Sequence, residues 1–275
     1  MRNQTTIPPG LQKVPPFPAV AARLLTLLSK PVPDVRKVAD VISSDPSLTA
    51  RVLNCVNSYE FGLSNRVSNV RQAIGLMGLE RTRQVTVMNA TAMYVRNLMT
   101  AELLRCWHHC VATAVLANEI ADGCGEFSEA AFTMGIMHDI GRIGLFAAYP
   151  QEYQRLIHNA EDQGLDLVEL EKQEFGMDHA EAGQLLADSW QLPRELFPII
   201  GRHHHACEGH DVNLLRIVHI ACSLADTLGF GVVVPPTQPD FGSALDEFPM
   251  LFRTCLRRTP EELSQLIEQR IATVT

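Results

Sequence analysis

The chain has 275 residues, of which 46 % are hydrophobic and 20 % charged, a composition that excludes a disordered or fibrous protein and suffices for one large or two small domains. Its formal net charge of −8 argues against a dedicated nucleic-acid-binding protein, which needs a basic face to neutralise phosphates. No apolar run approaches the ~18 residues needed to span a bilayer, and MRNQTTIPPG at the N-terminus has no hydrophobic signal core.

The cysteines indicate the cellular compartment. There are seven of them, with no CxxC pair, at positions 55, 106, 110, 124, 207, 222 and 255. An odd and scattered set predicts reduced thiols rather than a disulfide framework. We therefore expect a cytoplasmic protein with no membrane partner.

The first part of the chain reads as a proline-rich lead-in over residues 1–18, followed by helices. Apolar spacing, capping aspartates and glycine stops are the signals. They predict helices over residues 20–28, from Asp34 to about 42, from Asp45 to about 56, from 68 or 69 to a stop at Gly78, and from 82 to about 99.

The remainder is also predicted to be helical, over about 101–122, 127–138, 150–161, 166–174, 179–189, 193–204 and 212–228. Residues 232–247 form a looser stretch, and a capping box at Thr259 opens a last helix. The predicted fold class is all-α. We expect an N-terminal helical lobe over 14–100, a helical core over 101–230, and a linker with a terminal helix over 231–275.

The sharpest local feature is His138-Asp139, in GIMHDIGRIG. The two residues lie together at the end of an apolar helix, just before an expected glycine turn. Imidazole and carboxylate suit a divalent metal, and a carboxylate can bridge two ions. An isolated HD dipeptide is a weak signal, since surface or capping use explains it equally well.

All ten histidines lie at or after position 108, so a histidine-based site belongs to the second part of the chain. His109 lies on a mostly apolar helix, His179 lies near a helix start, and His203 and His204 lie at a predicted helix end. The competing interpretation is that these are satisfied core histidines or a solvated helix terminus. The pattern alone leaves both interpretations open.

The order of these residues resembles the HD superfamily of metal-dependent phosphohydrolases, and the wider context resembles its regulatory branch, the HDOD domain. The supporting stretches cover about residues 14–230 and are PPFPAVAARLLTLLSK, VRKVADVISSDPSLTARVLNCVNS, VSNVRQAIGLMGLERTRQ, CWHHCVATAVLA, GIMHDIGRIGL, HAEAGQLLADSWQLP and RIVHIACSLADTLGFG. The resemblance implies an N-terminal helical lobe packed on an HD-like helical core.

The resemblance also implies a metal constellation that would hold one or two divalent ions of iron, zinc or manganese. Matched position by position, the ligands are His109, His138, Asp139, His179, His203 and His204. The last superfamily ligand, an aspartate, aligns with Cys222. Either Cys222 or Asp226, one turn later, would take that place, and the alternative for Cys222 is a small buried apolar residue.

Other departures bear on activity. The lysine that often follows the HD pair is Arg142 here, which keeps a cation for a phosphate but with a different donor geometry, or is a solvated charge at a helix end. No GYP sequence is present, which argues against cyclic-di-GMP hydrolysis.

The resemblance implies a signalling module, without catalysis, that acts through a partner protein or a bound nucleotide or phosphate. The alternative is a metal-dependent phosphohydrolase of nucleotides or phosphorylated small molecules, in which metals would stabilise developing charge and Arg142 would hold a phosphate oxygen.

Overall fold

The computed structural model describes residues 8–30, 32–58, 61–62, 66–96, 100–125, 127–205, 212–234 and 240–272. Within these ranges the chain forms helices and contains no strand, which confirms the all-α prediction. None of these helices combines the length and apolar character that crossing a membrane requires. The start of the lead-in, the predicted helix end near residue 99, and Cys207 lie outside the described residues.

The N-terminal helices begin at or next to the starts that the sequence predicts. They are α1 (Ala19–Leu28), α2 (Val35–Ser43), α3 (Pro46–Val56) and α4 (Val70–Arg96). The carboxylate of Asp34 accepts hydrogen bonds from two backbone N–H groups of α2, and that of Asp45 accepts one from α3. Gly78, at φ 77°, interrupts α4 in the left-handed region that glycine readily adopts, so the predicted stop is confirmed.

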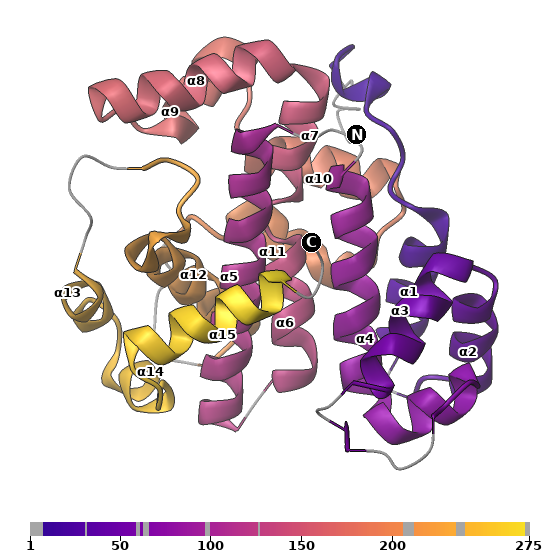
Figure 1. The fold of residues 1–275 in the computed structure, drawn as a ribbon. Coiled ribbons are helices and arrows are strands. Elements are labelled where there is room, and N and C mark those ends of the chain that lie inside the picture. Colours follow the sequence, from indigo (N-terminus) through magenta and orange to yellow (C-terminus); the bar gives the residue numbers. More distant parts are fainter. Residues whose placement is uncertain are drawn as a thin grey trace.

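Helix α5 (Ala101–Cys124) forms the axis of the second part (Figure 1). Apolar residues are buried around its whole circumference, as expected for a central helix. It contacts α4, α6, α7, α12, α14 and α15. The helices not yet bounded are α6 (Ser128–Met137), α7 (Ile140–Ala148), α8 (Pro150–Gln163), α9 (Leu167–Phe175), α10 (His179–Ser189), α11 (Phe197–Arg202), α12 (Leu214–Ala225), α13 (Phe241–Asp246), α14 (Met250–Cys255) and α15 (Pro260–Ala272).

The described residues form two hydrophobic cores. The smaller core joins α1, α2, α3 and the first part of α4. The larger core surrounds α5 and also takes in Leu11, Phe17 and the second part of α4. Because α1 and α4 contribute to both cores, side-chain packing is continuous between the lobes. The domain boundaries expected at residues 100 and 230 stay predictions.

The expectation of a glycine turn after the HD pair is wrong. Gly141 and Gly144 lie inside α7, and their role is close packing. A Cβ at Gly141 would collide with the carbonyl oxygen of His179 and the backbone nitrogen of Gly183. Small residues therefore allow α7 and α10 to pack backbone against backbone.

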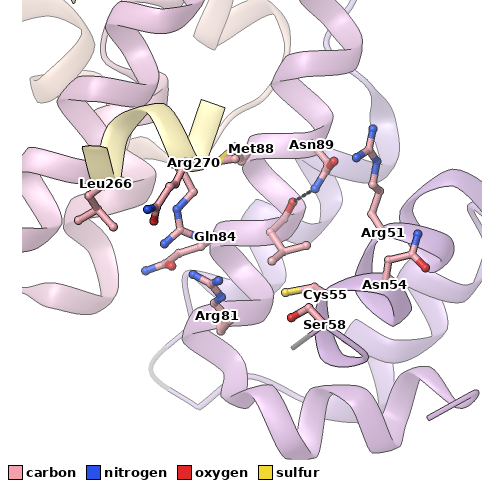
Figure 2. Close-up of a pocket in the computed structure, with 12 residues that line it drawn as sticks. Arg51, Asn54, Cys55, Ser58, Arg81, Gln84, Met88, Asn89, Leu266 and Arg270 are labelled. Carbon is pink, nitrogen blue, oxygen red and sulfur yellow. Dashed lines mark hydrogen bonds between the residues drawn. The ribbon is translucent and has the colours of Figure 1, made fainter. Parts of the chain in front are cut away.

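The prediction of a looser stretch over 232–247 is wrong in part, because this stretch contains α13. The sequence analysis also does not predict α14, which follows it. Both helices are only six residues long, too short for a clear periodic signal. The last helix, α15, begins at the predicted capping box, in which Thr259 and Glu262 exchange backbone and side-chain hydrogen bonds. It crosses α5 and lies beside α4 (Figure 2).

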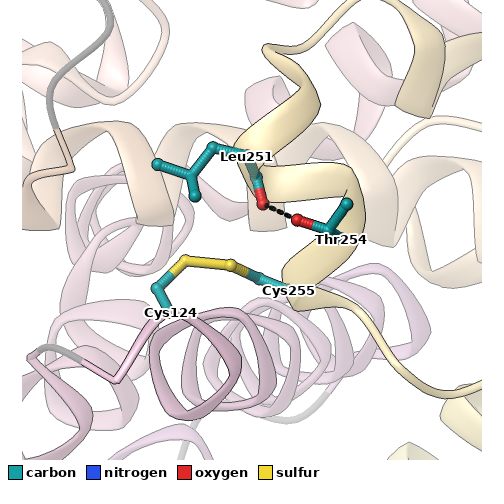
Figure 3. Close-up of a disulfide and its surroundings, with 4 residues drawn as sticks. All are labelled: Cys124, Leu251, Thr254 and Cys255. Carbon is teal, nitrogen blue, oxygen red and sulfur yellow. Dashed lines mark hydrogen bonds between the residues drawn. A yellow bond between two sulfur atoms is a disulfide. The ribbon is translucent and has the colours of Figure 1, made fainter.

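The prediction of reduced thiols throughout is also wrong. Cys124, at the end of α5, forms a disulfide with Cys255, at the end of α14 (Figure 3). The two residues are 131 positions apart, so no spacing rule could pair them. The bond fastens the C-terminal helices to the central helix. Among the remaining described cysteines, Cys55, Cys106, Cys110 and Cys222 are free.

We expect Gly141→Ala to destabilise the protein, because the new methyl group meets backbone atoms that cannot move aside. Overpacking of this kind costs about 1–3 kcal/mol or more. The measurement is the free energy of unfolding from chemical denaturation.

The matched control is Gly75→Ala in α4, where a Cβ meets nothing within 4 Å. Its better helix propensity should stabilise by ~0.5–1 kcal/mol. Equal effects of the two substitutions would contradict the close approach of α7 to α10.

Candidate metal centre

The structure brings all seven predicted metal ligands into one region of the core. Each comes from a helix or from a helix end: His109 from α5, His138 and Asp139 from the junction of α6 and α7, His179 from the first position of α10, His203 and His204 from the end of α11, and Cys222 from α12. All are buried except His204, which is exposed. The centre is thus enclosed, with its solvent side at His204.

Four of the imidazoles are oriented in the same way. In each, Nδ1 lies within hydrogen-bond distance of an oxygen that can only accept, so Nδ1 carries the hydrogen and Nε2 carries the lone pair. The distances are 3.1 Å from His109 to Phe230 O, 2.6 Å from His138 to Gly135 O, 2.6 Å from His179 to Glu171 Oε2, and 3.1 Å from His203 to Ile200 O. Histidines that bind metals are characteristically oriented by such outer hydrogen bonds.

Local helix chemistry explains these orientations. The last carbonyl groups of a helix have no partner inside it, and neither do the first N–H groups. His138 and His203 stand at the ends of α6 and α11 and donate to carbonyl groups of the preceding turn. His179 opens α10, and its backbone N–H donates to the same Glu171 oxygen that accepts from its ring, at 2.9 Å.

The donor atoms fall into two neighbouring groups. In the first, Nε2 of His109 lies 3.4 Å from Sγ of Cys222, and His138 completes a set whose donor atoms lie within 4.8 Å of one another. In the second, Nε2 of His179 lies 3.3 Å from Nε2 of His203 and 2.8 Å from Nε2 of His204. Imidazole and thiolate donors suit zinc or iron.

Asp139 lies between the two groups. Its Oδ1 is 3.3 Å from Nε2 of His179 and 3.9 Å from Nε2 of His203. Although both are buried, Asp139 Oδ1 and His138 Nε2 have no hydrogen-bond partner among the described residues. Buried polar atoms without a partner are costly and rare. A cation among these atoms would satisfy them, so the residues present fit a divalent metal.

The electrostatics favour the forms that bind metal. Burial lowers the pKa of His109 to about 4 and that of His138 to about 3, so both rings are neutral at pH 7. Burial raises the pKa of Asp139, but Arg142 and the neighbouring histidines outweigh it and hold the pKa well below its usual value. The candidate centre therefore holds an ionised carboxylate beside the neutral rings of His109 and His138.

The sequence model of the HDOD domain family matches residues 14–206, which is more than half of the chain and includes six of the seven ligand positions. The chain belongs to the HDOD domain family. The resemblance seen in the sequence is thereby confirmed.

One curated relative of this HDOD protein is an uncharacterized protein of Treponema pallidum (strain Nichols). It is 24 % identical over an alignment of 212 residues, which covers 74 % of this chain and 41 % of the relative. The chain therefore spans about two fifths of that relative's length.

Solved structures share the fold at low identity. An HDOD domain protein of unknown function from Geobacter sulfurreducens has a TM-score of 0.75 and 21 % identity, covering 95 % of this chain and 91 % of that one. A protein of Marinobacter aquaeolei VT8, provisionally named a signal transduction protein, has a TM-score of 0.71 and 20 % identity, covering 96 % of this chain and 60 % of that one. A protein of Shewanella amazonensis SB2B, provisionally named a phosphohydrolase, has a TM-score of 0.67 and 22 % identity, covering 96 % of both chains.

Arg142 is buried in this HDOD core rather than exposed to a ligand. Its Nε donates to Asp139 Oδ2 at 2.7 Å, its Nη2 lies 3.1 Å from Nε2 of His179, and its Nη1 contacts Tyr153 and Glu171. These contacts orient the Asp139 carboxylate and leave its Oδ1 toward the histidines. The predicted contact of Arg142 with a phosphate stays a prediction.

Glu171 is the residue that the sequence analysis missed. It is fully buried on α9 and joins His179, Arg142 and Tyr153. Burial raises the pKa of Glu171, but His179 and Arg142 reverse the shift and lower it. Nothing in LVELEKQEF distinguishes this glutamate from its exposed neighbours, so only its hydrogen bonds to His179, at the start of α10, identify it.

The alternatives for the last ligand, Cys222 and Asp226, lie on opposite sides of His109. The Sγ of Cys222 faces Nε2, whereas Oδ1 of Asp226 lies 3.4 Å from Nδ1, the outward nitrogen. This arrangement favours Cys222 as the ligand. Burial raises the pKa of its thiol well above the usual value, so a metal must displace the proton when it binds.

We expect the metal-free protein to lose stability as the pH falls below 6.5. The unfolded chain then protonates histidines that the folded core keeps neutral, so the unfolded state binds more protons. Between pH 6.5 and 5 the contribution of His109 alone is about 2 kcal/mol. Urea unfolding at several pH values measures it.

His109→Gln should flatten this pH dependence, while His158→Gln, at an exposed histidine of α8, should not. Equal slopes for wild type and His109→Gln would contradict the neutral state assigned to His109.

We expect cobalt(II) added to metal-free protein to produce a near-ultraviolet thiolate-to-cobalt charge-transfer band. Cys222→Ser should abolish the band, and Cys55→Ser, at a cysteine outside the centre, should retain it. If the wild type shows no band and Asp226→Asn loses cobalt affinity, the last ligand position belongs to Asp226 instead of Cys222.

Proposed function

We propose that this HDOD protein is a non-catalytic signalling module that holds a divalent metal in its core and passes a conformational signal to a partner protein. The observation that carries the proposal is the enclosure of the donors: His109, His138, Asp139, His179 and His203 are each at most 4 % exposed. Catalytic metal sites keep a position open for substrate, whereas structural sites are closed.

The surroundings of the centre support the same role. Arg142, the cation nearest the HD pair, is engaged by protein groups, and a cysteine stands where catalytic relatives have an aspartate. Two cavities, of about 300 and 440 Å³, are lined by other residues. Their lining, as far as the structure describes it, includes none of the seven candidate ligands.

A physical connection joins the centre to the N-terminal lobe. Met137 immediately precedes the HD pair, and its sulfur lies 3.9 Å from the hydroxyl of Thr91 on α4. Because α4 belongs to both hydrophobic cores, a change at the HD pair would reach the lobe along α4, across the interruption of this helix at Gly78. We propose that lobe as the face that meets the partner.

The alternative function is a metal-dependent phosphohydrolase. It is favoured by the paired donor groups on either side of Asp139, which could hold two ions, and by the exposed edge at His204. Bound metals would supply Lewis-acid stabilisation of phosphoryl charge. Asp139 and the four oriented imidazoles would hold the ions, and Arg142 would keep Asp139 in position.

We expect about stoichiometric metal in protein purified without chelator or histidine tag, measured by mass spectrometry. His138→Ala and Asp139→Ala should lose it, because each removes a buried donor that faces the other donor atoms. His158→Ala is the matched control, and circular dichroism verifies folding.

A panel of nucleotides and phosphorylated small molecules separates the two functions. The signalling proposal predicts no turnover, but slower hydrogen exchange in the α6–α7 junction and in α4 when metal is added. Turnover that disappears in both variants would establish the hydrolase. Metal content unaffected by the substitutions would eliminate the metal centre from either function.

A further inference from the structure

The two donor groups of the metal centre differ in what their ring nitrogens contact. In the first group, Nε2 of His138 is buried and has no hydrogen-bond partner among the described residues. In the second group, Nε2 of His179 lies 3.1 Å from Nη2 of Arg142. The first group therefore has a donor atom left to satisfy, whereas the second group already has a cation beside it.

The hydrogen on the His179 ring fixes the direction of its contact with Arg142. Glu171 Oε2 lies 2.6 Å from Nδ1 of His179 and accepts its hydrogen, so Nε2 carries the lone pair. A guanidinium group has only N–H donors, so Nη2 of Arg142 donates to that lone pair. A lone pair engaged in this way is not available to a metal. An ion can therefore bind His179 only if Arg142 moves away.

The contacts of Arg142 oppose such a movement. Its side chain is buried, Nε donates to Asp139 Oδ2 at 2.7 Å, and Nη1 lies 3.5 Å from Glu171 Oε1 and 3.4 Å from the hydroxyl of Tyr153. Hydrogen bonds between charged groups are the strong ones. Moving the guanidinium group away would also leave two buried carboxylates without their cation, which is costly.

The charges of the described residues at the centre balance with a single ion. Arg142 offsets one of the two buried carboxylates with which it pairs, those of Asp139 and Glu171. This leaves one negative charge, and Cys222 supplies another when it binds a metal as a thiolate. One divalent ion balances both, whereas two ions would leave two positive charges in a buried site. Asp226 stands outside this set, with a side chain 54 % exposed to solvent.

We infer that Arg142 takes the place of a second metal ion, and that the centre binds one divalent ion, in the first donor group. That group consists of His109, His138 and Cys222. Asp139 is the fourth donor within reach, since its carboxylate oxygen lies within 4.8 Å of the donor nitrogen of His138, and structural zinc sites have four ligands. The inference rests on the proposed metal and deepens that proposal, because it states how many ions bind and where.

Cobalt(II) titration of the metal-free full chain counts the ions. We expect wild type to bind one equivalent, with the thiolate charge-transfer band complete at that point. Cadmium NMR of cadmium-saturated wild type repeats the count without any substitution, and one resonance is expected. Two equivalents or two resonances would overturn the inference and leave the proposed metal centre intact. No bound cobalt or cadmium would instead overturn the metal centre itself, and this inference with it.

Arg142→Gln should create a second cobalt site. Without the guanidinium group, Nε2 of His179 is free to bind, so a second equivalent should bind about tenfold or more tightly than any second ion binds to wild type. It should leave the thiolate band unchanged, because Cys222 is in the first group. Adding His204→Gln should abolish the second site, since His204 is a donor of the second group. Arg155→Gln, at an exposed arginine of α8, is the matched control and should bind one equivalent.

A second variant keeps the test decisive if the loss of Arg142 alone prevents folding. Arg142→Gln combined with Glu171→Gln removes a buried carboxylate together with its cation, and the new amide oxygen can still accept from Nδ1 of His179. Circular dichroism and thermal unfolding verify folding. A second cobalt equivalent is expected here too. Binding of only one equivalent by either folded variant would overturn the inference, because Arg142 would then not be what excludes a second ion.

Discussion

The orientation of four buried imidazoles is the constraint on which the rest of this structure depends. Each ring has Nδ1 engaged by a carbonyl or carboxylate oxygen, so each must direct a bare nitrogen into the core. The nitrogens of His138, His179 and His203 meet the Asp139 carboxylate where the ends of α6, α10 and α11 converge, and that of His109 lies beside Cys222. The convergence in turn requires α7 and α10 to approach at glycine.

The proposed non-catalytic function depends on enclosure. Donors buried on all sides but one suit a retained ion better than a substrate that must be bound and released. The resemblance implies that Cys222 replaces an aspartate ligand, and this replacement and the engagement of Arg142 by its neighbours act in the same direction.

Much of this site could be predicted from the sequence because its signals are local. A histidine-aspartate pair after an apolar helix, and histidines at helix ends, are visible without a structure. The caps at Asp34, Asp45 and Thr259 place helix starts correctly for the same reason, since each bond spans only two or three residues. Glu171 and the Cys124–Cys255 bond were not predictable, because their partners lie on other helices.

The sequence by itself determined the helical class, most helix starts, the family and the residues that converge in the candidate metal centre. These properties follow from periodicity, capping and motif order, all of which act over a few residues. Only the tertiary structure decided which nitrogen of each ring faces the centre, that Cys222 rather than Asp226 lies beside His109 Nε2, and that Arg142 lies beside His179 Nε2. Those outcomes depend on how helices cross, and packing of distant segments leaves no local trace in the chain.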